Sequence, residues 1–340
     1  MSTPAIDYIC DNCGEPAPLR CIRCLGAFYC GKECQKKMWR EHKVLCKEAA
    51  KVLDGMPIDE FDKTFEESKR LAEVGNADAQ YNLGVSYANG TGVAMDKPTS
   101  IKWYTLAAEA GIVEAQLHLG TCYFDGNGVA VDKHEAIKWY TRAAEAGDAD
   151  AQVNLGNCYL NGDGIALDQR EAVKWFTRSA EAGHVGAQFN LGTCFFFGNG
   201  VQSVDKCEAV KWFTSAAEAG YFKAQNNLGI CYDYGDGVAV NKREAVRWYM
   251  LAAEAGHEDA QFNLGNIYFN GDGVPIDNRE AFKWYTRAAE AGQINAQFNL
   301  ANRYFNGDGI AVNKMEAIKW FTRAAKAGDA EAQTMLDRIQ

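Results

Sequence analysis

The sequence predicts an all-α fold, a right-handed α-solenoid of two-helix repeats that follows a small cysteine-rich segment. Tryptophan returns about every 36 residues over most of the 340-residue chain, and apolar residues between the tryptophans have helical spacing. Seven of the twelve cysteines fall between Cys10 and Cys46. The apolar fraction of 47% excludes a disordered chain.

Landmark residues define the repeat. The intervals between the tryptophans are 36 residues, except for one of 37, whose extra residue lies in the loop GNGVQSVDKCEA. This period predicts seven full units over 76–328, between half-units at 64–75 and 329–340. The tryptophans are Trp103, Trp139, Trp175, Trp212, Trp248, Trp284 and Trp320.

One unit, 148–183, illustrates the expected hairpin. Its first helix ends at the glycines of NGDG, and its second helix begins at DQRE. Asp168 is expected to cap the second helix, while Glu171 returns the bond to the backbone of Asp168. The same pair recurs as Asp132/Glu135, Asp205/Glu208, Asn241/Glu244, Asp277/Glu280 and Asn313/Glu316.

Small residues recur where the two helices must approach closely, opposite large aromatic residues. A hairpin of this kind is covered only by its neighbours, so the units are expected to stack into a solenoid. The small residues of the first helix are Gly84, Gly120, Gly156, Gly192, Gly229 and Gly265.

The unit AQVNLGNCYLNGDGIALDQREAVKWFTRSAEAG and its copies resemble the Sel-one-like repeat family over residues 64–340. The resemblance implies an α-solenoid that acts as an adaptor or scaffold for protein complexes and not as an enzyme. By resemblance to the related tetratricopeptide solenoids, one face of the first helices lines a concave surface.

Positions on that face vary from unit to unit and offer aromatic rings and amides to an extended peptide. The alternative interpretation is that the rings only pack between units. The candidate partner-binding residues are Phe262, Asn266, Asn270, Phe298, Asn302 and Asn306.

Four cysteines of the repeats occupy one equivalent position, just before the landmark aromatic residue. One thiol per unit cannot place four ligands around one zinc ion, so a role as a small buried apolar side chain is expected. These residues are Cys122, Cys158, Cys194 and Cys231.

The amino-terminal cysteines show metal-ligand spacing. Eight soft ligands suit two tetrahedral zinc ions with no open position for water, so catalysis at the metal is not expected. The ligands are Cys10, Cys13, Cys21, Cys24, Cys30, Cys34, His42 and Cys46.

This spacing resembles the MYND-type zinc finger over residues 10–46. The resemblance implies a cross-brace, with Cys10, Cys13, Cys30 and Cys34 on one Zn²⁺ and Cys21, Cys24, His42 and Cys46 on the other. It also implies that Gln35 and Trp39 bind a proline-rich peptide. The alternative is that Trp39 closes the small core of the finger. A linker, 47–63, leads to the solenoid.

Charge and hydropathy limit the partners. Residues 1–50 carry a formal charge of +2, so the remainder carries −12, which disfavours nucleic acid. No apolar run reaches the roughly 20 residues that span a membrane, and the start lacks the features of a signal peptide. A cytoplasmic or nuclear location is therefore expected.

The sequence favours a zinc-binding adaptor for protein or peptide partners. Two alternatives stay open. The first is a transcriptional co-regulator that acts through recruitment by the finger. The second is part of a protein lysine methyltransferase system, although residues 64–340 are occupied by repeats.

Overall fold

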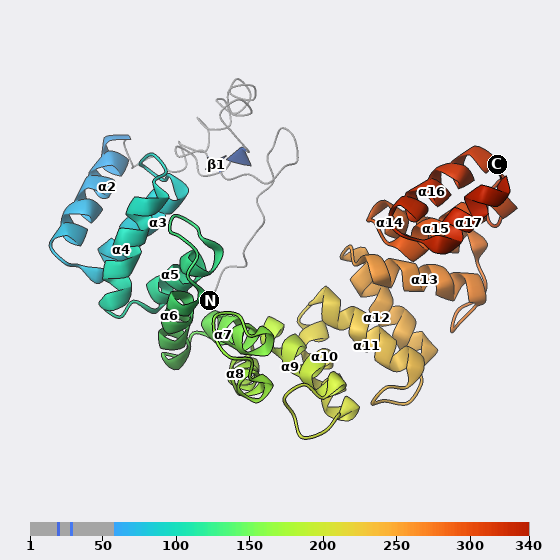
Figure 1. The fold of residues 1–340 in the computed structure, drawn as a ribbon, viewed down its shortest axis with the longest axis horizontal. Coiled ribbons are helices and arrows are strands. Elements are labelled where there is room, and N and C mark those ends of the chain that lie inside the picture. The colour runs from blue at the N-terminus through green and yellow to red at the C-terminus, as the bar shows by residue number, and fades with distance from the viewer. Residues whose placement is uncertain (1–18, 21–27, 30–57, 340) are drawn as a thin grey trace. The chain divides into compact units, whose positions relative to one another are not determined.

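A computed structural model describes residues 19–20, 28–29 and 58–339, with side-chain surroundings from residue 65 onward. The described residues form sixteen helices, α2 to α17, and one two-stranded ribbon (Figure 1). In the ribbon, β1 (Leu19–Arg20) pairs antiparallel with β2 (Phe28–Tyr29), and Leu19 lies opposite Tyr29. The all-α solenoid is therefore confirmed apart from this ribbon, while the two-zinc cross-brace lies outside the described residues.

The helices follow the repeat in pairs, and every helix from α3 to α16 has 13 residues. They are α2 (Ile58–Glu73), α3 (Ala77–Asn89), α4 (Lys97–Glu109), α5 (Val113–Asp125), α6 (Lys133–Glu145), α7 (Ala149–Asn161), α8 (Gln169–Glu181), α9 (Val185–Phe197), α10 (Lys206–Glu218), α11 (Phe222–Tyr234), α12 (Lys242–Glu254), α13 (Glu258–Asn270), α14 (Asn278–Glu290), α15 (Ile294–Asn306), α16 (Lys314–Lys326) and α17 (Ala330–Ile339).

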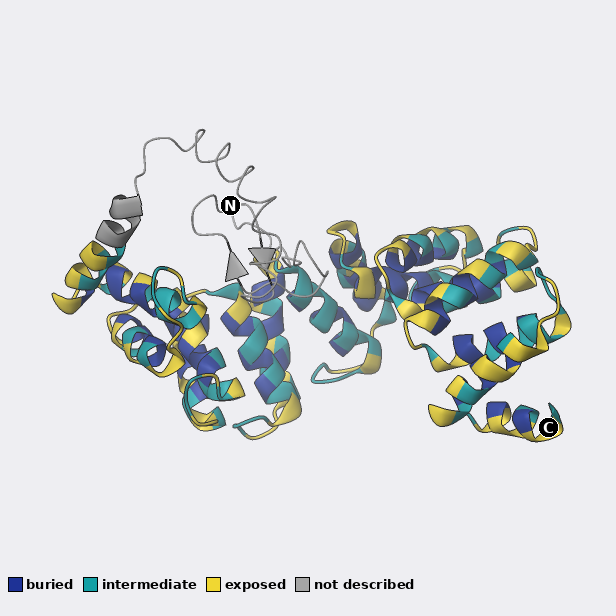
Figure 2. Cartoon of the chain, turned by 90° about the horizontal axis from the view of Figure 1, so that it is seen from above, coloured by how far each residue is buried: buried dark blue, intermediate teal, exposed yellow. Residues whose placement is uncertain are grey.

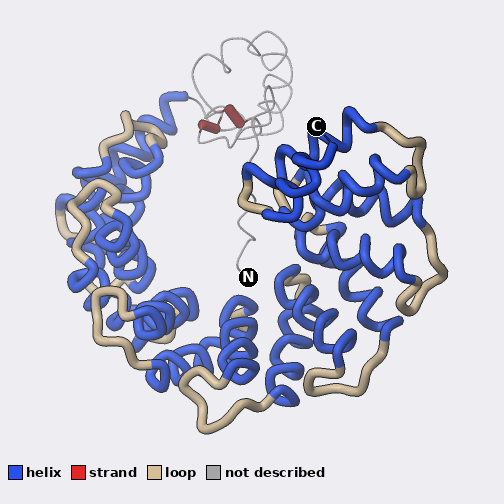
Figure 3. Tube along the Cα trace, turned by 45° about the vertical axis from the view of Figure 1, so that its right-hand side comes forward, coloured by secondary structure: helices blue, strands red, loops and turns tan. Residues whose placement is uncertain are grey.

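The chain divides into two compact units, Met1–Ala151 and Gln152–Gln340. Within each unit, successive helices pack on one another, from α2 to α6 and from α8 to α17. In the second unit the longer loops, drawn in tan, run along one edge of the stack (Figure 3). Burial forms stripes along the helices, whereas loops and helix ends are mostly exposed (Figure 2). The right-handed course of the array stays a prediction.

Glycine on the first helix sets how closely the two helices of a hairpin approach. A Cβ added to Gly265 would lie 2.5 Å from Cδ1 of Tyr285, and one added to Gly156 would lie 2.6 Å from Cε1 of Phe176. Both rings are fully buried. The predicted close approach is confirmed, because the aromatic ring of the second helix occupies the space that a side chain would need.

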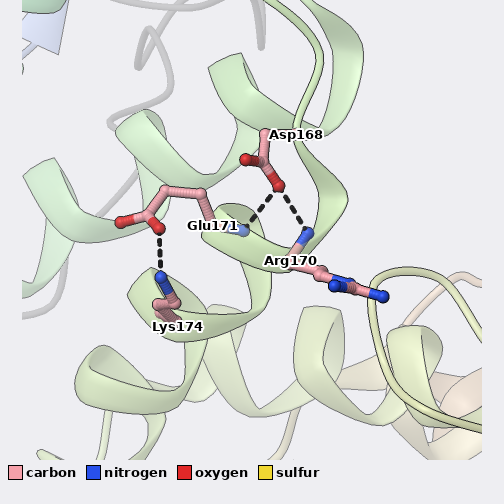
Figure 4. A network of polar contacts seen from close by, with 4 residues as sticks. All are labelled: Asp168, Arg170, Glu171 and Lys174. Carbon is pink, nitrogen blue, oxygen red and sulfur yellow. Dashed lines mark hydrogen bonds and ion pairs between the residues drawn. The ribbon is translucent and has the colours of Figure 1, made fainter.

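The second helix begins at the predicted cap. Asp168 Oδ1 accepts hydrogen bonds from the backbone N–H groups of Arg170, at 3.0 Å, and Glu171, at 3.1 Å (Figure 4). The return bond from Glu171 was wrongly predicted. Glu171 Oε2 instead accepts from Lys174 Nζ, and the Asp168 N–H donates to the Tyr159 carbonyl of the preceding helix at 2.9 Å.

The N–H of the cap residue already bonds to a carbonyl of the first helix. The glutamate carboxylate therefore pairs with a cation three residues later instead of with that N–H. The same backbone bond to the first helix forms at Asp96, Asp132, Asp205, Asn241, Asp277 and Asn313.

The landmark glutamine ties consecutive hairpins together. Gln261 Nε2 donates to the Ala253 carbonyl at 3.0 Å, across the turn between α12 and α13. This carbonyl lies in the last turn of α12 and also accepts a hydrogen bond from the Gly256 N–H at 3.1 Å, so the glutamine adds a second bond that comes from the next helix. Equivalent bonds are made by Gln80, Gln116, Gln188, Gln225 and Gln297.

We expect Gly265→Ala to destabilise the protein, because the new methyl group must displace the Tyr285 ring. Overpacking costs about 1–3 kcal/mol, which exceeds the roughly 1 kcal/mol that alanine gains over glycine in a helix. Urea denaturation followed by circular dichroism measures the change.

The control is Gly186→Ala in α9, where an added Cβ would approach only the imidazole of His184, at 3.0 Å. This variant is expected to be as stable as the parent or more stable. Equal stabilisation by both substitutions would contradict the packing argument.

Candidate functional site

The candidate groove residues lie on α13 and α15, the first helices of the sixth and seventh units. The Phe262 ring is half-buried, with its centroid 6.1 Å from that of Tyr285, and the Phe298 ring lies 5.6 Å from that of Phe321. Each ring therefore packs on the second helix of its own unit and keeps part of its surface in solvent.

The candidate amides differ in how firmly they are held. Asn266 Oδ1 accepts a hydrogen bond from the Tyr285 hydroxyl at 2.7 Å, so it is positioned from the second helix. Asn302 is half-buried, whereas Asn270 and Asn306 are exposed at the ends of their helices. On α13, the Asn266 amide is therefore held by a hydrogen bond, whereas the Asn270 amide faces solvent.

Sequence reasoning missed a second set of amides beside these. Asn299 Nδ2 donates to Asn266 Oδ1 at 3.5 Å, and Asn190 Nδ2 donates to Asn157 Oδ1 at 3.3 Å. Each bond joins the first helices of successive units. The signal was present as an asparagine that recurs with the repeat period at Asn154, Asn190, Asn227, Asn263 and Asn299, all half-buried.

The four equivalent cysteines of the repeats are buried, as predicted. Burial raises the pKa of the Cys194 thiol to about 11. Burial, with a smaller contribution from Asp236, raises the pKa of Cys231 to about 12. These groups stay protonated near neutral pH, so they behave as small apolar side chains. Cys207, outside this set, is exposed.

The predicted metal ligands and the predicted peptide-binding residues Gln35 and Trp39 lie outside the described residues. In the sequence, Cys21 directly follows β1 and Cys30 directly follows β2. The donor set of seven thiols and one imidazole fits zinc. Across the described ranges, His, Cys, Asp and Glu form no group of three or more that could bind a metal ion.

None of the described helices has the length and apolar character needed to cross a membrane.

Stacked helix hairpins, six of them with a glycine–aromatic contact, define an α-solenoid repeat protein. The family model for the Sel1 repeat matches residues 77–112, 113–148, 149–184, 185–221, 222–257, 258–293 and 294–329. The chain therefore belongs to the Sel1 repeat family. The model for the MYND finger matches residues 10–46.

Solved structures agree with this assignment. The chain is similar to c5321, a protective antigen of uropathogenic Escherichia coli with an SLR fold, at 33% identity and a TM-score of 0.77, over 90% of this chain and 66% of that one. It is similar to a Sel1 repeat protein from Oxalobacter formigenes at 31% identity and a TM-score of 0.71, over 91% of each chain.

A curated human protein, histone-lysine N-methyltransferase SMYD3, is 46% identical over 41 residues. The match covers 12% of this chain and 10% of that protein.

We expect the buried repeat cysteines to resist alkylation in the native protein. At pH 8, iodoacetamide should modify Cys207 while Cys194 and Cys231 remain unmodified, because their raised pKa values leave almost no thiolate. Mass spectrometry of tryptic peptides measures the modified fraction. The same reaction in urea is the control, in which all three thiols should react. Native-state modification of Cys194 as fast as that of Cys207 would refute the burial argument.

Proposed function

We propose that the chain is a zinc-binding adaptor that holds one partner on the finger, 10–46, and another on the solenoid, 64–340. The observation that carries the proposal is the combination of a MYND finger with seven Sel1 repeats in one chain. Two modest sites on one chain raise the effective concentration of each partner for the other. The proposal assigns no catalytic role to any residue.

In the finger, we infer two zinc ions in closed tetrahedral sites. Cys10, Cys13, Cys30 and Cys34 would hold the first ion, and Cys21, Cys24, His42 and Cys46 the second. Sites of this kind supply folding energy to a segment too short to bury a core of its own.

The partner of the finger is inferred to be a proline-rich peptide that contacts Gln35 and Trp39. An indole ring covers the flat face of a prolyl segment, and an amide can bond its backbone. The net charge of −10 favours protein partners over nucleic acid.

We expect Trp39→Ala to weaken binding of a proline-rich peptide by about tenfold or more while the zinc content stays at two ions per chain. The reason is that the ring contacts the peptide and ligates no metal. Fluorescence anisotropy with a labelled proline-rich peptide measures binding, and elemental analysis measures zinc.

His42→Ala is the control, since it should lower the zinc content. If Trp39→Ala lowered the zinc content as His42→Ala does, the ring would close the core instead. Unchanged peptide binding at full zinc content would also argue against the peptide site.

In the solenoid, the groove is inferred to bind an extended peptide through Asn266 and Asn302, with Phe262, Phe298, Asn270 and Asn306 around them. The Tyr285 hydroxyl holds the Asn266 side chain through its oxygen, which leaves the amide N–H₂ available as a donor. A positioned amide binds a peptide carbonyl at a lower entropic cost than a mobile one.

We expect the double variant Asn266→Ala/Asn302→Ala to lose retention of the solenoid partner, as measured by pull-down and titration with the purified partner. Tyr285→Phe is the matched control, because it removes the same hydroxyl bond but keeps both amides. Its binding should fall by less than that of the double variant. If Tyr285→Phe lost as much partner binding as the double variant, the loss would come from the missing hydroxyl bond and not from amide contacts with the partner.

The similarity to SMYD3 raises methyl transfer as a second candidate. It extends over one tenth of that protein, whereas the residues from 77 to 329 of this chain are Sel1 repeats. The adaptor is therefore the favoured proposal, and recruitment of transcriptional regulators would be one form of it.

A further inference from the structure

The fourth and fifth units depart from the pattern of the chain at one exposed position. The last residue of the first helix is Phe197 in α9 and Tyr234 in α11, and these side chains are 64% and 72% exposed. The loop after Phe197 also carries the extra residue of the 37-residue interval. The other units have a polar residue at this position, namely Asn89, Asp125, Asn161, Asn270 and Asn306.

An exposed valine lies close to each of these helix ends. Val204, 54% exposed, follows Phe197, and a Cβ on Gly198 would lie 3.1 Å from its Cγ2. Val240, 58% exposed, is placed in the same way beside Gly235 after Tyr234. We call Phe197, Val204, Tyr234 and Val240 the aromatic patch. Single exposed apolar residues are ordinary, but neighbouring ones mark interaction surfaces.

One ion pair connects the two halves of the aromatic patch. The Phe197 ring packs edge-on against Phe196, with centroids 5.1 Å apart, and Lys206 Nζ lies 5.0 Å from the centre of the Phe196 ring. The same ammonium pairs with Asp236, two residues beyond Tyr234. The two exposed rings are therefore held on neighbouring parts of the second compact unit.

The charges around the rings favour a cationic ligand. Lys242 Nζ lies 5.8 Å from the centre of the Tyr234 ring but is paired with Asp233 at 2.6 Å, as Lys206 is paired with Asp236. These two ammonium groups are therefore each paired with a carboxylate. Both rings end their helices, where the helix dipole is negative, and the chain is acidic overall. Lysine and arginine are attracted to aromatic faces in such a field.

We propose that the aromatic patch binds a peptide segment in which an aliphatic side chain is flanked by lysine or arginine. The aliphatic group would lie on Val204, Val240 and the ring edges, and the cation over an open ring face. The proposal rests on the function of the solenoid as a peptide-binding module and assigns it a site separate from Asn266 and Asn302.

The test selects random heptapeptides displayed on phage against the intact chain and measures binding of the selected peptides by calorimetry. The expected peptides carry an aliphatic residue next to lysine or arginine. Their affinity should fall about tenfold or more in Phe197→Asn/Tyr234→Asn, since buried aromatic contacts dominate such interfaces. Asparagine is native at this position in four units, so the variant should keep its fold, which circular dichroism checks.

Ile276→Asn is the matched control, because Ile276 is an exposed apolar residue at the position equivalent to Val204 and Val240, outside the patch. It should bind like the parent. Selection of acidic peptides, no selection at all, or equal affinity in the double asparagine variant would overturn the proposal. Loss of binding only in Asn266→Ala/Asn302→Ala would overturn it and leave the proposed groove standing.

Discussion

The contact between a helical glycine and an aromatic ring determines the geometry of six of the seven hairpins. Tyr249 and Phe176 are fully buried against Gly229 and Gly156, and each ring contributes about 2–3 kcal/mol through burial. In these six hairpins a Cβ would collide with the ring, whereas the seventh has the fully buried Ala301 at the equivalent position. The approach also brings the end of the first helix within reach of the Asp168 N–H, which bonds to Tyr159. In these six units the close approach of the two helices therefore depends on one missing side chain.

The sequence predicted the hairpins because every landmark returns with the period, and agreement over seven copies outweighs ambiguity in any one of them. It correctly predicted that Asp168 caps the second helix, but not the partner of the Asp168 N–H. The return bond from Glu171 was wrongly predicted because the Asp168 N–H bonds to Tyr159, nine residues earlier in a different helix. Local pattern rules consider only bonds within one helix. The asparagine contacts between units were missed for the same reason, since a bond such as Asn190–Asn157 spans 33 residues.

Cysteine serves two purposes in this chain, and spacing separates them. Cysteines in close succession between Cys10 and Cys46 suit metal ligation, whereas Cys194 and Cys231, one unit apart, share only a place in the core. Thiols can act in either way because a neutral thiol is apolar while a thiolate binds zinc. At Cys194 burial alone raises the pKa and keeps the thiol neutral, whereas at Cys231 the charge of Asp236 adds to the effect of burial.

In a repeat protein, an unusual residue can be compared with the residues at the equivalent position of the other units. In the seventh unit, Arg303 replaces the buried cysteine, but it packs over the Phe269 ring at 3.8 Å and faces Asp308 at 3.4 Å. That substitution gains contacts within the chain, while Nε and Nη1 of Arg303 are buried without a hydrogen-bond partner. Phe197 and Tyr234 replace polar residues and leave most of their surface in water. Exposing a large ring brings no gain in folding free energy, because burial is what makes an aromatic side chain stabilising. A partner that covers these rings accounts for them better than the fold does.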